Sequence, residues 1–309
     1  MSVSAPTTER TAAPPPSDPA PTYGACSIKR PRRTKAEMQA LRGAAYEVLA
    51  AQHPASVRGV FYLLYVRDLI SKREYQAVVR LLTLMRRDGS LPYEWITDAT
   101  RYMHKADSFT SMEHALRVAA QTFRLQVWHA LPVRVEIWCE SRAIIGVLFE
   151  ETDEWDVPLM PVGGFSSVTF LEASGRAIRR AGKETYCYYF GDHDPSGLSI
   201  GKKIEDDVRH HPGGIPVHFE RVAVTPEQIA AWSLPTKPPN PNDSRSKRFE
   251  GNTVELDAIP PRRLRELVRA CITRHIDPRA LAELRRQEDQ ERRTLEHVAD
   301  QVAGWGRAS

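Results

Sequence analysis

Two aspartates, two positions apart, follow a short apolar and aromatic segment of this 309-residue chain. Residues 185–190 read as a buried strand, and Asp192 and Asp194 follow within four residues of its end. Pro195 and Gly197 then turn the chain toward a helix. Neighbouring carboxylates at the end of a buried strand repel each other and resist desolvation, so a bound cation is the simplest explanation of the pair. Oxygen-only ligands favour Mg²⁺, or Mn²⁺ as an alternative, over zinc.

A third acid occupies an equivalent place earlier in the sequence. Residues 133–140 read as a strand that ends in Glu140. Open α/β sheets bind ligands at the carboxyl ends of their strands, so Glu140, Asp192 and Asp194 are the candidate metal ligands. An Asp-x-Asp-Pro-x-Gly run is also common in turns, because Asp accepts backbone hydrogen bonds and Gly tolerates positive φ. A turn without a metal is therefore the alternative interpretation.

The order of these acids resembles that of a known family. One Glu after one strand and an Asp-x-Asp after a later strand is the acidic constellation of TOPRIM domains. The run from Asp192 through Asp194 to Ile200 resembles the A subunit of type IIB topoisomerases (topoisomerase VI) and its relative, the meiotic double-strand-break transesterase. Phrases between residues 253 and 277 are similar to the later part of that family. The family's TOPRIM glutamate would be Glu140.

The resemblance implies an activity and partners. It implies Mg²⁺-dependent transesterification of double-stranded DNA by a homodimer, in which each active site takes its tyrosine from one protomer and its metal from the other. It also implies a separate ATPase subunit, and this chain has neither a GxxxxGK[ST] nor a GxGxxG run of its own. The family usually has a lysine after the glutamate, where this chain has Ser141 and Arg142. Arg142 offers a similar charge.

The same family carries an Arg-x-x-Tyr-Tyr phrase in an amino-terminal winged-helix domain. Arg58 matches the arginine and Tyr62 the second tyrosine, the nucleophile, whereas Phe61 replaces the first tyrosine. Attack by a tyrosine hydroxyl on a DNA phosphorus gives a phosphotyrosyl link, and an arginine and a metal stabilise the developing charge. A Tyr among apolar neighbours is also typical of a helix core. Tyr65, three residues on, is the alternative nucleophile.

Two other functions fit the same residues. A hydrolytic TOPRIM nuclease would use a metal-bound water as the nucleophile, and Tyr62 would then be structural. A DNA-binding protein that keeps the fold without cleaving is the third interpretation, but it offers no physical reason for a repulsive cluster of acids. A covalent protein–DNA adduct separates the first function from the second.

Composition and hydrophobic periodicity divide the chain into segments. Three helices followed by an extended hairpin over residues 91–96 indicate a winged helix. Strand–helix alternation from residue 133 onward indicates a mainly parallel sheet. The expected fold class is α/β, a Rossmann-like TOPRIM domain preceded by an α-rich winged-helix domain. The predicted segments are a disordered tail (1–27), a winged-helix domain (28–110), a connector helix (111–132), a TOPRIM domain (133–232), a flexible loop (233–252), and a C-terminal strand and helices (253–309).

A later pair of acids lies in an alternating segment, residues 253–259. Glu255 and Asp257 would add ligands to the metal in one interpretation, but we expect both side chains to face solvent.

Basic residues concentrate in the amino-terminal part of the chain. Residues 1–130 carry 18 Lys and Arg against 11 Asp and Glu, whereas the remaining residues carry 25 against 28. This asymmetry suits a polyanion held by one domain and a metal held by the other, although a solvated surface is the alternative. The candidate DNA contacts are Lys29, Arg30, Arg32 and Arg33 in a basic arm, and Arg80, Arg86, Arg87 and Arg101 in the helical region.

Cysteine usage and hydropathy indicate the compartment. Four cysteines are scattered without CxxC spacing, which argues against a zinc ribbon and against a disulfide framework. No apolar run is long enough to cross a membrane, and the amino terminus has no apolar signal region. We therefore expect a cytoplasmic protein, associated with the nucleoid in a bacterium.

Overall fold

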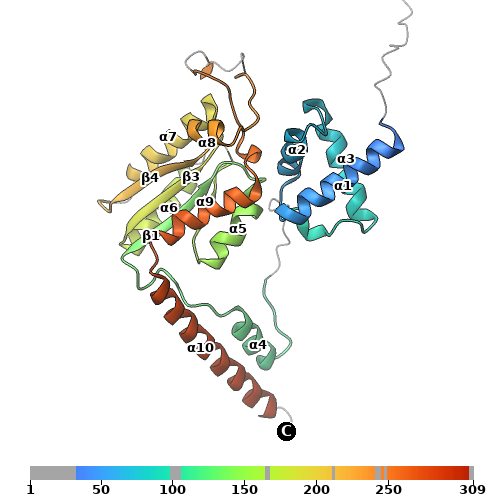
Figure 1. Ribbon diagram of the computed structural model, residues 1–309. Coiled ribbons are helices and arrows are strands. Elements are labelled where there is room, and N and C mark those ends of the chain that lie inside the picture. Colours follow the sequence, from blue (N-terminus) through green and yellow to red (C-terminus); the bar gives the residue numbers. More distant parts are fainter. Residues whose placement is uncertain are drawn as a thin grey trace, which may run out of the picture.

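The computed structural model describes residues 33–97, 106–163, 168–210, 213–240, 245–246 and 249–305. The predicted disordered tail, residues 1–27, lies outside these stretches. A bundle of short helices lies beside a larger α/β body, and one long helix extends from that body (Figure 1). In the described stretches, no helix is both long enough and apolar enough to cross a membrane.

Four parallel strands form the sheet of the α/β body. They are β1 (Val133–Cys139), β2 (Leu159–Pro161), β3 (Glu184–Phe190) and β4 (Val217–Ala223). Their order is β2-β1-β3-β4, and β1 pairs with β3 along its whole length. The two central strands are mostly buried because helices cover both faces, as is usual for a parallel sheet. The predicted α/β class with a parallel sheet is confirmed.

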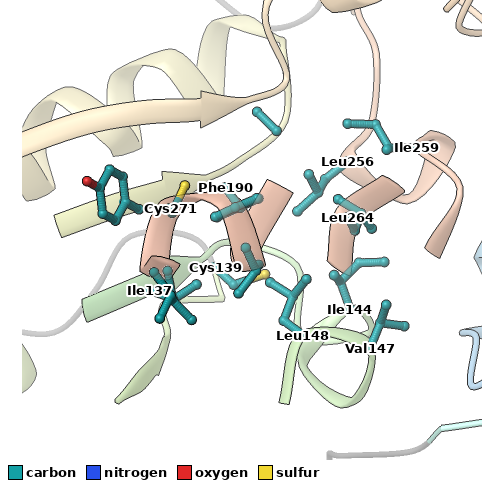
Figure 2. Packing of buried hydrophobic residues seen from close by; sticks show 14 of the residues in the cluster. Ile137, Cys139, Ile144, Val147, Leu148, Phe190, Leu256, Ile259, Leu264 and Cys271 are labelled. Atoms are coloured by element: carbon teal, nitrogen blue, oxygen red, sulfur yellow. The ribbon is translucent and has the colours of Figure 1, made fainter. Parts of the chain in front are cut away.

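Helices on the two faces bury alternate side chains of the central strands. The helices are α5 (Ile145–Glu154) and α9 (Pro261–Thr273) on one face, and α6 (Val168–Ala181) and α7 (Pro195–His210) on the other. In Figure 2, Leu148 of α5 and Leu264 of α9 lie in one cluster with Ile137 and Phe190 of the sheet. The carboxyl ends of β1 and β3 therefore emerge side by side between two helical layers.

The amino-terminal bundle has a hydrophobic core of its own. It consists of α1 (Lys35–Gln52), α2 (Val57–Val66), a 3₁₀ turn η1 (Lys72–Glu74) and α3 (Tyr75–Arg87). Helix α1 begins with a capping box, in which the Thr34 hydroxyl accepts from the Glu37 N–H and the Glu37 carboxylate accepts from the Thr34 N–H. The three predicted helices are confirmed.

The extended hairpin predicted over residues 91–96 is wrong. A 3₁₀ turn, η2 (Tyr93–Trp95), takes its place and is followed by a single bridge to Ala55. The ring of Trp95 stacks on His53 with the ring centroids 4.7 Å apart. This aromatic contact folds the segment back against the end of α1, which an extended hairpin would not allow.

The connector helix is shorter than predicted. Helix α4 (Met112–Thr122) ends at Phe123, whose backbone is extended. The Phe123 carbonyl accepts two hydrogen bonds, of 3.0 and 2.9 Å, from the guanidinium of Arg292. Arg292 belongs to α10 (Pro278–Trp305), the long helix along which α4 packs (Figure 1). The partner that ends α4 therefore comes from a distant part of the sequence.

The C-terminal strand predicted over residues 253–259 is also wrong. Thr253 and Val254 form one isolated bridge each, to Lys237 and to His193. A 3₁₀ turn, η4 (Leu256–Ala258), follows. The remaining short helix, α8 (Pro226–Ala231), lies between β4 and this region in the sequence.

Candidate active site at the carboxyl edge of the sheet

Glu140 lies at the carboxyl end of β1, as predicted. Its backbone N–H donates to the Phe190 carbonyl (2.8 Å), and its own carbonyl accepts from the Gly163 N–H (3.1 Å). Its Oε2 atom accepts from the Tyr189 hydroxyl (2.9 Å) and from the backbone N–H of Asp192 (3.1 Å). Burial raises the pKa of Glu140. The carboxylate is thus held against the end of β3.

Asp192 follows β3 and lies beside Glu140. Its Oδ1 atom accepts from the backbone N–H of Leu256 at 2.8 Å. Burial raises the pKa of Asp192 to about 7, and the nearby carboxylates of Glu140 and Asp194 act in the same direction. The ionised form of Asp192 is therefore unfavourable in this place, and a bound cation would stabilise it.

Asp194 caps helix α7. Its Oδ1 atom accepts from the Gly197 N–H (2.7 Å), and its carbonyl accepts from the Leu198 N–H (3.0 Å). Asp is favoured at such N-terminal positions without any ligand. A capping role accounts for Asp194, but it does not account for the half-buried Glu140 and Asp192.

The three carboxylates offer only oxygen ligands, which suits Mg²⁺ or Mn²⁺. Among the described residues, however, no three Asp, Glu, His or Cys side chains are arranged to hold a metal ion. Each of the three carboxylates directs one oxygen to an O–H or N–H donor of the chain. The oxygen ligands and the raised pKa values of Glu140 and Asp192 fit a cation, whose coordination would require the side chains to rearrange.

Arg221, on β4, belongs to the site. Its guanidinium donates to the carbonyls of Gly191 (3.0 Å) and Gly197 (3.3 Å) and to that of Asp192, and it lies 5.3 Å from the centroid of the Tyr189 ring. Burial lowers the pKa of Arg221. A half-buried cation thus shapes the loop that carries both aspartates. Nothing in the sequence of β4 distinguishes this arginine from a solvent-facing one, which is why the pattern does not reveal it.

Arg58 and Tyr62 lie one turn apart on α2 and meet at the carboxylate of Glu255. The NH1 atom of Arg58 is 3.0 Å from Glu255 Oε2. Burial, reinforced by the Glu255 carboxylate, raises the pKa of Tyr62 well above its ordinary value, so the hydroxyl is protonated at neutral pH. Tyr62 also packs against the cores of both the bundle and the α/β body. The alternative nucleophile, Tyr65, stacks on Phe61 instead.

Residues 255–257, which we call the connecting segment, contact both groups. Glu255 pairs with Arg58 on α2, and the next residue, Leu256, donates its backbone N–H to Asp192. The acids at the edge of the sheet and the Arg–Tyr pair of α2 therefore lie on two sides of one short stretch of chain.

Asp257 is buried, and the prediction that it faces solvent is wrong. Its Oδ1 atom accepts from the Ser56 hydroxyl (3.2 Å), and its Oδ2 atom accepts from the Ser141 hydroxyl (2.8 Å). Ser56 also caps α2 by accepting from the Gly59 N–H (2.9 Å), and Ser141 directly follows Glu140. Burial raises the pKa of Asp257. One carboxylate thus ties the start of α2 to the end of β1.

The candidate DNA contacts differ in what surrounds them. Arg80 and Arg87 are exposed on α3, and Arg86 is half-buried. Arg33 is not an extended arm residue, because its guanidinium bonds to Glu74 at 2.8 Å and fastens the start of α1 to the turn before α3. The other candidates lie outside the described residues: Lys29, Arg30, Arg32 and Arg101.

Comparison of the sequence with models of known protein families gives no match, and no curated protein matches it either. The function therefore has to be inferred from the chemistry of the site.

Proposed function

We propose that the chain is a DNA-cleaving transesterase similar to the A subunit of type IIB topoisomerases. The helical bundle, in which residues 93–95 form a 3₁₀ turn in place of the expected hairpin, would be its DNA-binding domain, and the α/β body its TOPRIM domain. The observation that carries this proposal is the connecting segment, which contacts Arg58 on one side and Asp192 on the other. A tyrosine beside an arginine, close to a cluster of carboxylates, is the set of groups that metal-assisted transesterification needs.

Tyr62 would supply the nucleophile. Its hydroxyl oxygen attacks a DNA phosphorus, the bond from phosphorus to a deoxyribose oxygen breaks, and a phosphotyrosyl ester forms. The tyrosine proton passes to water, and the leaving deoxyribose oxygen takes a proton from water. Arg58 stabilises the charge that develops on the phosphate oxygens. Because the pKa of Tyr62 is raised, its hydroxyl carries a proton when the DNA binds.

Glu140, Asp192 and Asp194 would hold Mg²⁺, or Mn²⁺ in its place. An ion bound there would offset the negative charge of the phosphate. The chain itself positions two of these ligands, since the Tyr189 hydroxyl holds Glu140 and the Leu256 N–H holds Asp192.

The partners follow from the same proposal. Double-stranded DNA would lie along the exposed arginines of α3, where phosphate contacts supply affinity without sequence preference. The protein would act as a homodimer, together with a separate ATPase subunit. Because the connecting segment contacts Arg58 and Asp192 of the same chain, each protomer would combine its own tyrosine and acids, unlike the shared active site that the resemblance implies. A cytoplasmic, nucleoid-associated location also belongs to the proposal.

Trapping of a covalent adduct tests this function. Purified protein is incubated with supercoiled or linear DNA and Mg²⁺ or Mn²⁺, then denatured, and the protein that remains linked to DNA is measured. We expect an adduct with the wild type and with the matched control Tyr65→Phe. We expect none with Tyr62→Phe or Asp192→Ala. An adduct that survives Tyr62→Phe would overturn the assignment of the nucleophile.

A hydrolytic nuclease is the second candidate, because Tyr62 packs against both cores as a structural tyrosine does. Free DNA ends that survive Tyr62→Phe but vanish with Asp192→Ala would assign hydrolysis. Metal-independent binding without any cleavage would indicate a non-cleaving DNA-binding protein.

A further inference from the structure

Glu255 is a carboxylate held by two cations next to Tyr62. Its Oε2 atom lies 3.0 Å from Arg58 NH1, and its Oε1 atom pairs with the ammonium group of Lys237. The side chain of Glu255 is only 17% exposed, against 49% for Arg58 and 50% for Lys237. The expectation that Glu255 faces solvent is therefore wrong. The two cations remain within reach of a ligand from outside, whereas the acid fills the space between them.

A pocket of about 190 Å³ adjoins this ion cluster. Tyr62 and Glu255 line it together with a further cation, Lys72, whose ammonium group donates to the Thr236 carbonyl at 2.8 Å. The other lining residues are Phe61, Pro235, Thr236, Lys237 and Thr253. A small anionic group that entered the pocket would meet basic side chains and the candidate nucleophile together.

Lys237 is held in this position by its backbone. Its N–H donates to the Thr253 carbonyl (3.0 Å), and its carbonyl accepts from the Thr253 N–H (2.7 Å). This pairing places Lys237 beside the strand-like residues that lead into Glu255. The backbone of Lys237 is thus fixed beside this segment, and its half-exposed side chain reaches the Glu255 carboxylate.

We propose that Arg58 and Lys237 form a binding site for a phosphodiester group, and that Glu255 fills this site in the free protein. This inference rests on the proposed function and names the groups that would hold the scissile phosphate. Carboxylate and phosphate oxygens accept hydrogen bonds from the same cationic donors, so a bound phosphate has to displace Glu255. Asp257 does not compete in this way, because Ser56 and Ser141 occupy its oxygens.

Because the Glu255 carboxylate competes with phosphate for Arg58 and Lys237, removal of its charge should strengthen phosphate binding. We expect Glu255→Gln to bind a short blunt DNA duplex about threefold to fivefold more tightly than the wild type. This change in affinity corresponds to the free energy of one partly exposed ion pair. Fluorescence anisotropy at fixed salt, in a Tyr62→Phe background that cannot form an adduct, measures this affinity. The matched control is Glu266→Gln, which removes the same charge from an exposed ion pair with Arg262 on α9. The gain should disappear in the double variant Glu255→Gln/Lys237→Gln.

A second readout separates this site from the function on which it rests. Inorganic phosphate should raise the melting temperature of Glu255→Gln more than that of the wild type, since a ligand of the folded state stabilises it. Suppose that no variant binds duplex DNA, but inorganic phosphate still raises the melting temperature of Glu255→Gln more than that of the wild type. The anion site is then supported and the proposed function is wrong. Suppose instead that the wild type forms an adduct, but Glu255→Gln shows neither a higher affinity for duplex nor a larger melting-temperature rise with phosphate. The proposed function is then supported and the anion site is wrong.

Discussion

The backbone N–H of Leu256 donates a hydrogen bond of 2.8 Å to Oδ1 of Asp192, a residue 64 positions earlier in the sequence. The orientation of a carboxylate at the edge of the sheet thus depends on the connecting segment. Because the neighbouring residue Glu255 pairs with Arg58, a displacement of this segment would affect both groups of the proposed active site.

Replacement of Asp192 by Asn should stabilise the metal-free protein and abolish DNA cleavage. The folded-state pKa of about 7 exceeds the unfolded value of about 4, so the folded state binds the extra proton between these values. The wild type therefore loses stability as the pH rises through this window, and Asn avoids the loss. We expect the free energy of unfolding in urea to rise by roughly 1–3 kcal/mol at pH 8 and to be unchanged near pH 4.

Mg²⁺ provides a control for the Asp192→Asn comparison that does not depend on cleavage. At pH 8 the ion should stabilise the wild type more than the Asn variant, because the variant has lost a ligand. An Asn variant that is less stable than the metal-free wild type at pH 8 would contradict an unfavourable, half-buried carboxylate at Asp192.

Replacement of Gly197 by Ala should destabilise the fold and abolish activity. A Cβ at this position would lie 2.3 Å from the Asp192 carbonyl oxygen and 3.1 Å from Glu140 Oε2. The loop and the first turn of α7 would have to separate, at a cost of about 2 kcal/mol or more in unfolding free energy. The matched control is Gly43→Ala on α1, where no atom lies within 4 Å and where Ala should stabilise by about 0.5–1 kcal/mol. Equal effects at both positions would show that close packing at Gly197 is unimportant.

Replacement of Asp257 by Ala should weaken the attachment of α2 to the sheet. The hydroxyls of Ser56 and Ser141 would lose their shared acceptor, and we expect a loss of about 1–3 kcal/mol in unfolding free energy. Asp257→Asn keeps an acceptor and should lose less. The exposed Asp206→Ala, which removes an ion pair with Lys202, should change stability by less than about 0.5 kcal/mol. If Asp257→Ala loses no more unfolding free energy than Asp206→Ala, Asp257 does not stabilise the attachment of α2 to the sheet.

Stability should fall at mildly acidic pH because of His275. The Tyr188 hydroxyl lies 2.6 Å from His275 Nε2, and burial lowers the pKa of His275. A histidine whose folded-state pKa is lowered opposes folding when it is protonated. The contribution of neutral His275 to the free energy of unfolding is therefore fully present above pH about 6.5. It is lost as the pH falls below that value, because the unfolded state then binds the proton more readily. Urea unfolding between pH 7.5 and 5 should show a weaker pH dependence for His275→Gln, whereas the exposed His297→Gln should behave as the wild type.

The parallel sheet and the position of Glu140 and Asp192 could be predicted because they depend on local signals. Apolar runs mark β1 and β3, and an acid follows each of them within two residues. The roles of Arg221 and Asp257 could not be predicted, because each depends on partners that the fold brings from other segments.

The errors in secondary structure have the same origin. Helix α4 ends where Arg292 captures the Phe123 carbonyl, and the expected hairpin becomes a 3₁₀ turn where Trp95 meets His53. In both cases a tertiary contact overrides a local preference.

The place of the connecting segment in the sequence bears on how the protein is made. A ribosome that has reached residue 250 has already produced Tyr62, Glu140 and Asp192. It has not yet produced Glu255, which pairs with Arg58, Leu256, which holds Asp192, or helix α9, which packs on one face of the sheet. Protein segments fold from the amino terminus as they emerge, so the bundle can form early while the edge of the sheet stays incomplete. The proposed active site would therefore be incomplete in a nascent chain. The proposed reaction would become possible only after the connecting segment and α9 have been synthesised.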